Sequence, residues 1–462
     1  MLAKLPALPV TQRTKVMLGV AVCAALARLP GVYDRPFWED EVASARVLSQ
    51  STLGALVHRV AYKESTPPLW YAIGWVVHLA GVPLREERLL SVLFGAVLAA
   101  GTVALAHRFV SLPLAGTAGL LVALGGEFVT HGHELRAYEL FALLSLLFGL
   151  CLVSAIEVRS TGRNVALAST VALGGSTHYF FAYSVLAALV WLWLDPRVRA
   201  MRTRLSLSIL AGGAIAALWA PLMLVQYHHD RFSWIGPFRV RYVVAVPLRL
   251  FTQAWNNTTV GAVLSTTALV VVMLGCRRLA ATAAGTAVAV LGLGPLAAGA
   301  LAWLAGSDTF DLRNLIGIGP FVATAVVAAL ELLPLRAYAP VAATASLALV
   351  VSLALYGGDH LPRFDRIAQT LVRAGWNGRE AIAVFGRPTL YQSPLGWYLP
   401  HQPRLREAHP VGSSCGPVFV VHPSGRVTVL RGTPGRRLVR RATLLVEPGR
   451  AELCAHRRIE RA

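Results

Sequence analysis

Three carboxylates stand side by side near the start of the chain, at Glu39, Asp40 and Glu41. Acidic residues are scarce, because the 462 residues contain only 23 Asp and Glu together. The triplet follows the first long apolar run, and packing adjacent carboxylates there costs desolvation and mutual repulsion. Such a group is typical of a general base or a metal ligand. An ordinary surface loop is the alternative interpretation, and the sequence leaves it open.

Further polar residues of the kinds that handle phosphate esters follow at the ends of later apolar runs. Arginine binds phosphate oxygens through paired N–H donors, and a carboxylate beside it can take a proton from an incoming hydroxyl. His131 and His133 also suit a metal site, although such a pair more often forms hydrogen bonds. An arginine at a helix end can equally reach lipid headgroups. The candidates are Arg88, His131, His133, Glu134, Arg136, His178, Tyr179, His228, His229, Asp230 and Arg313.

The composition indicates a membrane protein that crosses the bilayer many times. The chain is 55% hydrophobic and 14% charged, and apolar runs long enough to cross about 30 Å of hydrocarbon recur along it. A soluble chain would alternate apolar and polar residues far more often. The formal net charge of +20 is not arranged as a basic stripe with interleaved aromatic residues, so no nucleic-acid partner is expected.

Run length and the positions of loop arginines predict an all-α membrane domain with about eleven transmembrane helices. The first helix runs outward from a cytoplasmic N-terminus. The apolar segment Trp70–Leu79 is too short to cross, so residues 33–88 form a long first outer loop with interfacial helices. This topology places the candidate residues on the outer face. The expected spans are 16–32, 89–106, 112–129, 137–156, 165–178, a sixth that ends before Asp195, 205–225, an eighth that ends at Arg277, a ninth that ends before Ser307, a tenth that begins after Arg313 and Asn314 and ends near Glu331, and 338–356.

The chain changes character at Gly357, where the long apolar runs stop. Residues 1–356 are therefore expected to form the membrane domain, and residues 357–462 a small extracytoplasmic α/β domain. A helical pattern precedes a series of short apolar, β-branched runs that are typical of strands. The helix is expected around Phe364, Ile367 and Leu371, and the strands at 382–385, 418–421, 427–430 and 444–446.

The five cysteines divide between the two predicted domains. Cys23, Cys151 and Cys276 lie in expected spans and are interpreted as packing residues. Cys415 and Cys454 lie in the tail, which would meet an oxidising compartment. A disulfide between them and a pair of free thiols are both open hypotheses.

An ordered set of short motifs resembles the GT-C superfamily of membrane glycosyltransferases, which includes the protein O-mannosyltransferases and the lipid A aminoarabinose transferases. The resemblance covers about residues 15–330 and rests on the order of the motifs, since each one alone is weak. It implies the GT-C fold, a polyprenyl-phosphate sugar donor bound from the outer leaflet, and an acceptor outside the membrane. The motifs are Trp38-x-Asp40-Glu41-x-x-Ser44, Pro67-Pro68-Leu69-x-Tyr71, Arg88-Leu89-x-Ser91, Glu134-x-Arg136-x-Tyr138, His178-Tyr179 and Arg313-Asn314-Leu315.

The resemblance also implies roles for individual residues. Asp40 matches the family's catalytic acid in the first outer loop, and Glu134 and Arg136 match its second acidic and basic pair. We therefore expect Asp40 to act as the base that deprotonates the acceptor. Glu41 or Glu134 is expected to orient this base, or to hold a divalent cation if one is used. The expected ligands of the donor phosphate are Arg88, Arg136 and Arg313, and those of the substrate are His133, His178 and Tyr179.

The expected reaction moves a sugar of the mannose or arabinose type, with inversion, onto an extracytoplasmic glycan, lipid or protein at a bacterial plasma membrane. A polyprenyl-lipid flippase or transporter is the alternative from another class. A transporter would be expected to show inverted repeats and broken helices at mid-membrane, whereas here the charges gather at one face. A purely structural membrane protein would leave that gathering unexplained.

Overall fold

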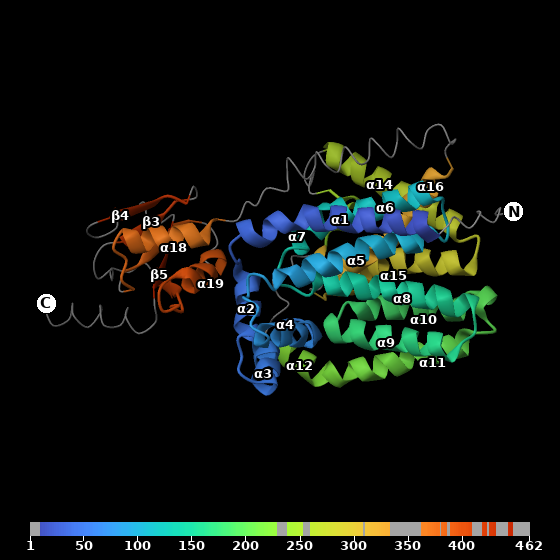
Figure 1. Ribbon diagram of the computed structural model, residues 1–462, viewed down its shortest axis with the longest axis horizontal. Helices are drawn as coiled ribbons and strands as arrows, with labels where there is room; N and C mark the ends of the chain where they lie inside the picture. Colours follow the sequence, from blue (N-terminus) through green and yellow to red (C-terminus); the bar gives the residue numbers. More distant parts are fainter. Residues whose placement is uncertain are drawn as a thin grey trace, which may run out of the picture. The chain divides into compact units, whose positions relative to one another are not determined.

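The computed structural model describes residues 10–228, 238–252, 259–307, 310–332, 362–378, 380–385, 389–408, 418–422, 425–430 and 442–446. The chain forms two compact units. The first comprises Met1–Tyr33 and Val47–Gly358, and the second comprises Asp34–Arg46 and Asp359–Ala462. Figure 1 shows the helices of the first unit and the small sheet of the second.

Every regular element described in the first unit is a helix. Helix α2 (Glu39–Leu48) begins in the second unit and ends in the first. The remaining elements are α1 (Val10–Asp34), α3 (Leu53–Lys63), α4 (Leu69–Leu79), α5 (Arg88–Ala106), α6 (Leu112–Leu124), α7 (Gly126–His131), α8 (Tyr138–Glu157), α9 (Thr161–Thr177), α10 (Phe181–Leu194), η1 (Pro196–Val198), α11 (Arg202–Ala216), η2 (Ala217–Trp219), α12 (Ala220–His228), α13 (Val240–Arg249), α14 (Thr259–Leu279), α15 (Ala283–Leu304), η3 (Arg313–Ile318) and α16 (Gly319–Leu330).

Seven helical segments in the described part of the chain are long and apolar enough to cross a membrane. A helix satisfies its own backbone hydrogen bonds, which hydrocarbon cannot do, so helices are the form that such sequences adopt. The segments are Gln12–Asp34, Arg88–Ala106, Tyr138–Glu157, Arg202–His228, Thr259–Leu279, Ala283–Leu304 and Arg313–Leu330. Shorter helices occupy the other expected spans except 338–356, which lies outside the described residues. Eleven crossings therefore stay a prediction.

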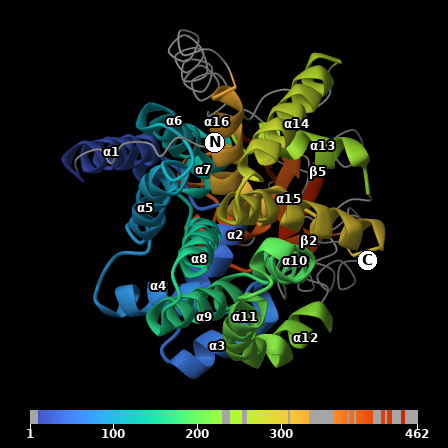
Figure 2. The ribbon, with the colours of Figure 1, turned by 90° about the vertical axis from the view of Figure 1, so that its right-hand side faces the viewer.

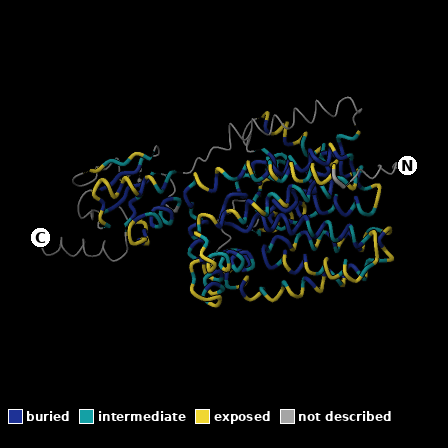
Figure 3. Tube along the Cα trace, in the orientation of Figure 1, coloured by how far each residue is buried: buried dark blue, intermediate teal, exposed yellow. Residues whose placement is uncertain are grey.

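Helix α8 forms the centre of the bundle, surrounded by α5, α9, α15 and α16 (Figure 2). Its central position agrees with the burial pattern, because nearly all residues between Tyr138 and Phe148 are buried (Figure 3). Small residues allow the close approach of neighbours. A Cβ on Gly149 would lie only 2.4 Å from the ring of Phe321, so glycine lets α16 pack against α8. The first residues of α8 carry the candidate motif and are fixed by this packing.

Short helices gather at one end of the bundle of the first unit, where the labels α3, α4 and α12 appear together in Figure 1. Helix α3 begins after Thr52, whose hydroxyl accepts from the backbone N–H of Ala55. Helix α12 packs against α3. The amide of Gln226 on α12 donates to the carbonyl oxygens of Val60 and Thr66, each at 3.1 Å. This buried amide fixes the loop between α3 and α4 to the bundle.

The second unit contains a five-stranded sheet in the order β2-β5-β1-β3-β4. Strands β1 and β3 are parallel, and the other neighbours are antiparallel. The predicted helix and strands form, and two further elements, β2 and α19, lack a clear signal in the sequence. The elements are α18 (Phe364–Arg373), β1 (Ile382–Phe385), α19 (Thr389–Tyr398), β2 (Arg406–Ala408), β3 (Val418–Val421), β4 (Val427–Leu430) and β5 (Ala442–Val446).

Alternation along β1 and β3 divides the core of this unit between the two faces of the sheet. Ile382, Val384 and Phe419 pack against one side of α18 and against α19, while Ala383 and Val420 lie in a smaller cluster on the other face. Cys415 and Cys454 fall outside the described residues, so their pairing stays a hypothesis. The three cysteines in the helices of the first unit, Cys23, Cys151 and Cys276, are free thiols.

Candidate active site

Tyr138, the first residue of α8, is the centre of a cluster of polar side chains in the first unit. The guanidinium carbons of Arg136 and Arg313 lie 5.7 Å and 5.9 Å from the centroid of its ring. The rings of His131 and His178 lie 4.6 Å and 6.0 Å from the same ring. Residues that are up to 182 positions apart in the sequence therefore meet at one tyrosine. Three of the predicted site residues, Arg136, His178 and Arg313, come together here.

Arg136 is buried and forms an ion pair with Glu64, which sequence reasoning did not select. Its Nη1 lies 2.8 Å from Oε2 of Glu64, and both residues are about 5% exposed or less. The same nitrogen lies 3.5 Å from the hydroxyl of Tyr71, which is 3.2 Å from Oγ1 of Thr66. Glu64 stands three residues before the Pro67-Pro68 motif. In the sequence, Glu64 is a single acidic residue near a short apolar helix, and nothing in the pattern predicts that it pairs with Arg136, 72 residues away.

The turn that carries Glu134 and Arg136 is held by the start of α5. The hydroxyl of Ser91 donates to the carbonyl oxygen of Glu134 at 2.7 Å. Arg88, one turn earlier, donates to the carbonyl oxygens of Val32 at 3.1 Å and Gly31 at 3.5 Å. Two of the short motifs thus touch each other, and Arg88 holds the C-terminal end of α1. This contact gives Arg88 a structural role beside the predicted role in phosphate binding.

Arg313 opens η3, which packs against α8. Its Nε lies 3.4 Å from Oδ1 of Asp311, whose side chain is 35% exposed. The same carboxylate oxygen accepts from the backbone N–H of Arg313 at 3.1 Å. The ion pair of Arg313 with Asp311 is therefore longer and more exposed to solvent than that of Arg136 with Glu64, and it is the weaker of these two pairs.

His131 lies between two carboxylates. Its Nδ1 is 2.7 Å from Oε2 of Glu134, and its Nε2 is 3.3 Å from Oε2 of Glu127. Burial opposes the charged form, yet Glu134 and Glu127 together raise the pKa of His131 well above its usual range. Both ring nitrogens of His131 are therefore engaged by carboxylates. Among the described residues, no group of three or more His, Cys, Asp and Glu is arranged to hold a metal.

His178 and Tyr179 follow the last residue of α9 and face different partners. The ring of His178 stacks on Phe141 at 4.5 Å and lies 5.5 Å from the ring of Phe180. Its Nδ1 accepts from the backbone N–H of Phe180 at 3.3 Å. The hydroxyl of Tyr179 donates to Oε1 of Gln226 at 2.8 Å.

His133 packs under the turn against α1, where a Cβ on Gly31 would lie 2.4 Å from its ring. The predicted site residues His133 and Tyr179 are thus placed by contacts with α1 and α12. Of the other candidates, His228 ends α12, while His229 and Asp230 lie outside the described residues.

The acid triplet occupies the first turn of α2, in the part of this helix that belongs to the second unit. Carboxylates are stabilised at a helix N-terminus by the helix dipole, by about 0.3–1 kcal/mol each. Glu41 is buried, whereas Asp40 is partly exposed. Burial and the neighbouring Asp40 raise the pKa of Glu39 to about 7. Just before the helix, the backbone N–H of Phe37 donates to the hydroxyl of Tyr398 at 2.6 Å.

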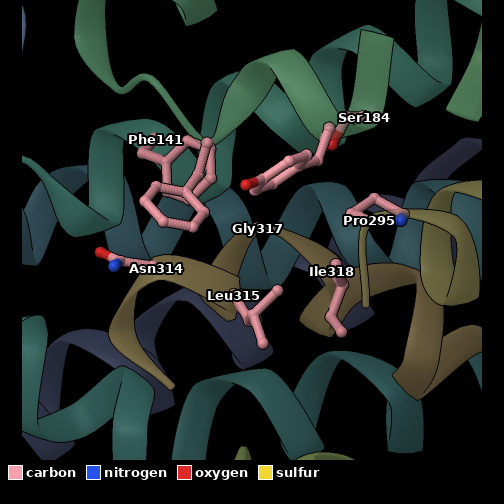
Figure 4. Close-up of a pocket in the computed structure, with 9 residues that line it drawn as sticks. Phe141, Ser184, Pro295, Asn314, Leu315, Gly317 and Ile318 are labelled. Atoms are coloured by element: carbon pink, nitrogen blue, oxygen red, sulfur yellow. The ribbon is translucent and has the colours of Figure 1, made fainter. Parts of the chain in front are cut away.

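A small pocket lies between α8, α10, α15 and η3 (Figure 4). Phe141 and Phe180, which contact His178, line it together with Asn314, the neighbour of Arg313. Tyr183, Ser184, Pro295 and Leu315 complete most of the wall.

No protein-family model matches the sequence, and the search of curated proteins found no match. Solved structures do match. ArnT from Cupriavidus metallidurans bound to undecaprenyl phosphate is 14% identical, with a TM-score of 0.53 over 84% of this chain and 76% of that one. The apo state of ArnT matches with a TM-score of 0.52 over 79% and 70% of the two chains. The oligosaccharyltransferase AglB from Archaeoglobus fulgidus is 14% identical, with a TM-score of 0.47 over 84% of this chain and 56% of that one. The chain therefore has the fold of ArnT, which agrees with the GT-C resemblance of its sequence motifs.

Proposed function

We propose that the protein is a membrane glycosyltransferase that takes a sugar from a polyprenyl-phosphate donor. The observation that carries the proposal is the pair of guanidinium groups beside the single ring of Tyr138. Two guanidinium groups on one ring suit an anionic leaving group such as a phosphate. The similarity to ArnT supports it, since that protein has been crystallised with undecaprenyl phosphate.

A phosphate must compete with the carboxylates that already pair with these arginines. Glu64 is buried and lies 2.8 Å from Arg136, so replacing it would be costly. Asp311 is one-third exposed and lies 3.4 Å from Arg313, so a phosphate oxygen can replace it at a small cost in free energy. We propose that Arg313 binds the phosphate directly, and that Glu64 holds Arg136 in the orientation from which its other N–H groups reach the ligand. Arg88 would act less directly, by holding α1.

The proposed reaction is an in-line displacement at the anomeric carbon. Asp40 takes the proton of the acceptor hydroxyl, whose oxygen forms a bond to that carbon. The bond from the carbon to the phosphate oxygen breaks, and its electron pair leaves with the polyprenyl phosphate. Arg313 and Arg136 stabilise the negative charge that develops there. Glu41 or Glu134 would orient this base, or would hold a divalent cation if the reaction uses one.

The finer assignments belong to the same proposal. The sugar is of the mannose or arabinose type, and the acceptor is an extracytoplasmic glycan, lipid or protein. His133 and Tyr179, which contacts with α1 and α12 hold in place, would contribute to the substrate site. The protein would cross the bacterial plasma membrane about eleven times, with a cytoplasmic N-terminus and an extracytoplasmic domain formed by residues 357–462.

Binding of undecaprenyl phosphate tests the phosphate site. Purified protein in detergent should bind undecaprenyl phosphate at least tenfold more tightly than undecaprenol, which lacks the phosphate. The variant R313Q should lose about 10- to 100-fold in affinity, the size of one charge-assisted hydrogen bond. The variant R277Q, at an exposed arginine near the end of α14, is the matched control and should bind normally. Equal affinity for the two lipids would contradict the proposal.

A further inference from the structure

His178 carries a buried hydrogen-bond donor that the folded chain does not use. The residue is 2% exposed, and three aromatic rings, those of Phe141, Phe180 and Tyr138, fix the plane of its imidazole. Its Nδ1 lies 3.3 Å from the backbone nitrogen of Phe180, which donates to it. Because Nδ1 accepts this bond, it carries no proton, and the proton of the neutral ring must lie on Nε2.

The Nε2–H group has no hydrogen-bond partner among the residues that the structure describes. Buried donors in folded proteins are nearly always paired, so an exception calls for an explanation. The surroundings indicate the kind of partner, because His178 shares the ring of Tyr138 with the guanidinium groups of Arg136 and Arg313. The donor and both guanidinium groups therefore favour the same kind of partner, an anionic oxygen acceptor. A cationic or purely apolar group would satisfy none of the three.

We infer that Nε2–H of His178 donates a hydrogen bond to a phosphate oxygen of the lipid-linked donor, as a third ligand beside Arg136 and Arg313. The inference rests on the proposed function, because it names an atom within the same site. A neutral N–H donor fixes the direction of one hydrogen bond to the phosphate without adding net charge. It therefore supplements the charge–charge attraction that Arg136 and Arg313 exert on the phosphate. It also fixes one oxygen of the phosphate group relative to the stacked ring. This bond should strengthen as the leaving phosphate gains charge.

Two substitutions separate the donor from the ring. His178→Phe keeps an aromatic ring for Phe141 and Phe180 but removes the N–H group. His178→Gln loses the ring and keeps an amide N–H near the position of Nε2. We expect the phenylalanine variant to bind undecaprenyl phosphate about 10- to 100-fold more weakly than the wild type, with unchanged affinity for undecaprenol. The glutamine variant should stay within about fivefold of the wild type. Thermal unfolding of both variants checks that they fold.

A direct distance measurement does not depend on whether either variant folds. Solid-state NMR of protein with 15N-labelled histidine and bound undecaprenyl phosphate should show dephasing of a side-chain nitrogen by the 31P nucleus, at a separation below about 4 Å, as the length of one hydrogen bond requires. No dephasing in protein that binds the lipid would overturn the inference. Equal losses of affinity in the two variants would also overturn it, because packing alone would then explain His178. If wild-type protein binds undecaprenyl phosphate no better than undecaprenol, the proposed function itself fails.

Discussion

At the scale of single residues, Arg136 shows how a buried charge can be both stable and useful. An unpaired guanidinium in this position would be strongly destabilising, and Glu64 at 2.8 Å compensates it. The pair leaves the cluster around Tyr138 less positive than the arginines alone suggest. Stability and phosphate affinity should therefore respond in opposite directions when the carboxylate is neutralised.

The variant E64Q tests this opposition. Loss of the carboxylate charge should lower the unfolding free energy by about 1–3 kcal/mol, because Arg136 loses its charged partner. Affinity for undecaprenyl phosphate should rise severalfold, because the competing negative charge is gone while the amide oxygen still accepts from Arg136 and keeps its orientation. Thermal unfolding and lipid binding measure the two effects. The control E157Q breaks the exposed pair of Glu157 with Arg108 and should change neither. A rise in stability, or weaker binding, would contradict the role given to Glu64.

Glu87 should make stability depend on pH. Burial raises the pKa of Glu87 to about 8 from its usual value near 4.5. The folded protein then holds a proton that the unfolded chain has already released, so the unfolding free energy falls as pH rises from about 4.5 to about 8. Thermal unfolding across this range should show the loss in the wild type and a flatter profile in E87Q. The exposed neighbour provides the control E86Q, which should follow the wild type. An unchanged profile in E87Q would refute the assignment.

At the scale of elements, the site depends on α1, α5 and α8 meeting at the turn that follows α7. Arg28 of α1 lies under this turn, fully buried, and its guanidinium is 3.4 Å from Oε1 of Glu139 on α8. It also donates to the carbonyl oxygen of Ala123 at 2.8 Å. This close packing leaves no room for a side chain at Gly132.

The variant G132A should therefore disrupt the site. A Cβ at this position would lie 2.1 Å from Nε of Arg28 and 2.5 Å from the carbonyl oxygen of Phe128. We expect the unfolding free energy to fall by about 2–3 kcal/mol, as for other overpacked cores, and phosphate binding to weaken. The control is G213A in α11, where a Cβ would meet nothing within 4 Å. That variant should be neutral or slightly stabilising. Equal effects in the two variants would count against the packing argument.

Sequence patterns predict the elements of this site better than the pairings within it. Apolar periodicity and the ordered motifs predict the helices, and they bring Arg136, His178 and Arg313 to one cluster. Glu64 and Glu127 gave no signal, because each acts through a partner that only the folded chain brings near. The tautomer of His178 was equally hidden, since it depends on a bond from the backbone of Phe180.

At the scale of the whole molecule, the acid triplet packs with the C-terminal part of the chain. Residues 34–46 belong to the same compact unit as residues 359–462. The hydroxyl of Tyr398 accepts from the backbone of Phe37, and the rings of Phe37 and Trp397 lie 6.1 Å apart. The sequence gives no sign of this contact, which joins residues 361 positions apart. Helix α19 is therefore in a position to set the geometry of Asp40.

The variant Y398F tests that connection. Loss of the hydroxyl removes a hydrogen bond, worth roughly 0.5–2 kcal/mol, that helps to position Asp40. The rate of sugar transfer should therefore fall about 3- to 30-fold. Binding of undecaprenyl phosphate should not change, because Arg136 and Arg313 belong to the other unit. The control Y391F alters the same helix at a ring that packs on Phe364 in the core. A loss of lipid binding in Y398F, or full activity, would contradict the connection.

Sugar transfer by purified protein tests the central claim most directly. Wild-type protein in nanodiscs would be given radiolabelled polyprenyl-phosphate sugars, including mannose and arabinose, with a cell-envelope extract as acceptor. The variant D40N and a sample with EDTA would run in parallel. We predict transfer from at least one donor, a fall of about 10²- to 10⁴-fold in D40N, and unchanged binding of undecaprenyl phosphate by that variant. Full activity in D40N, or no transfer from any donor by protein that binds the lipid phosphate, would contradict the account.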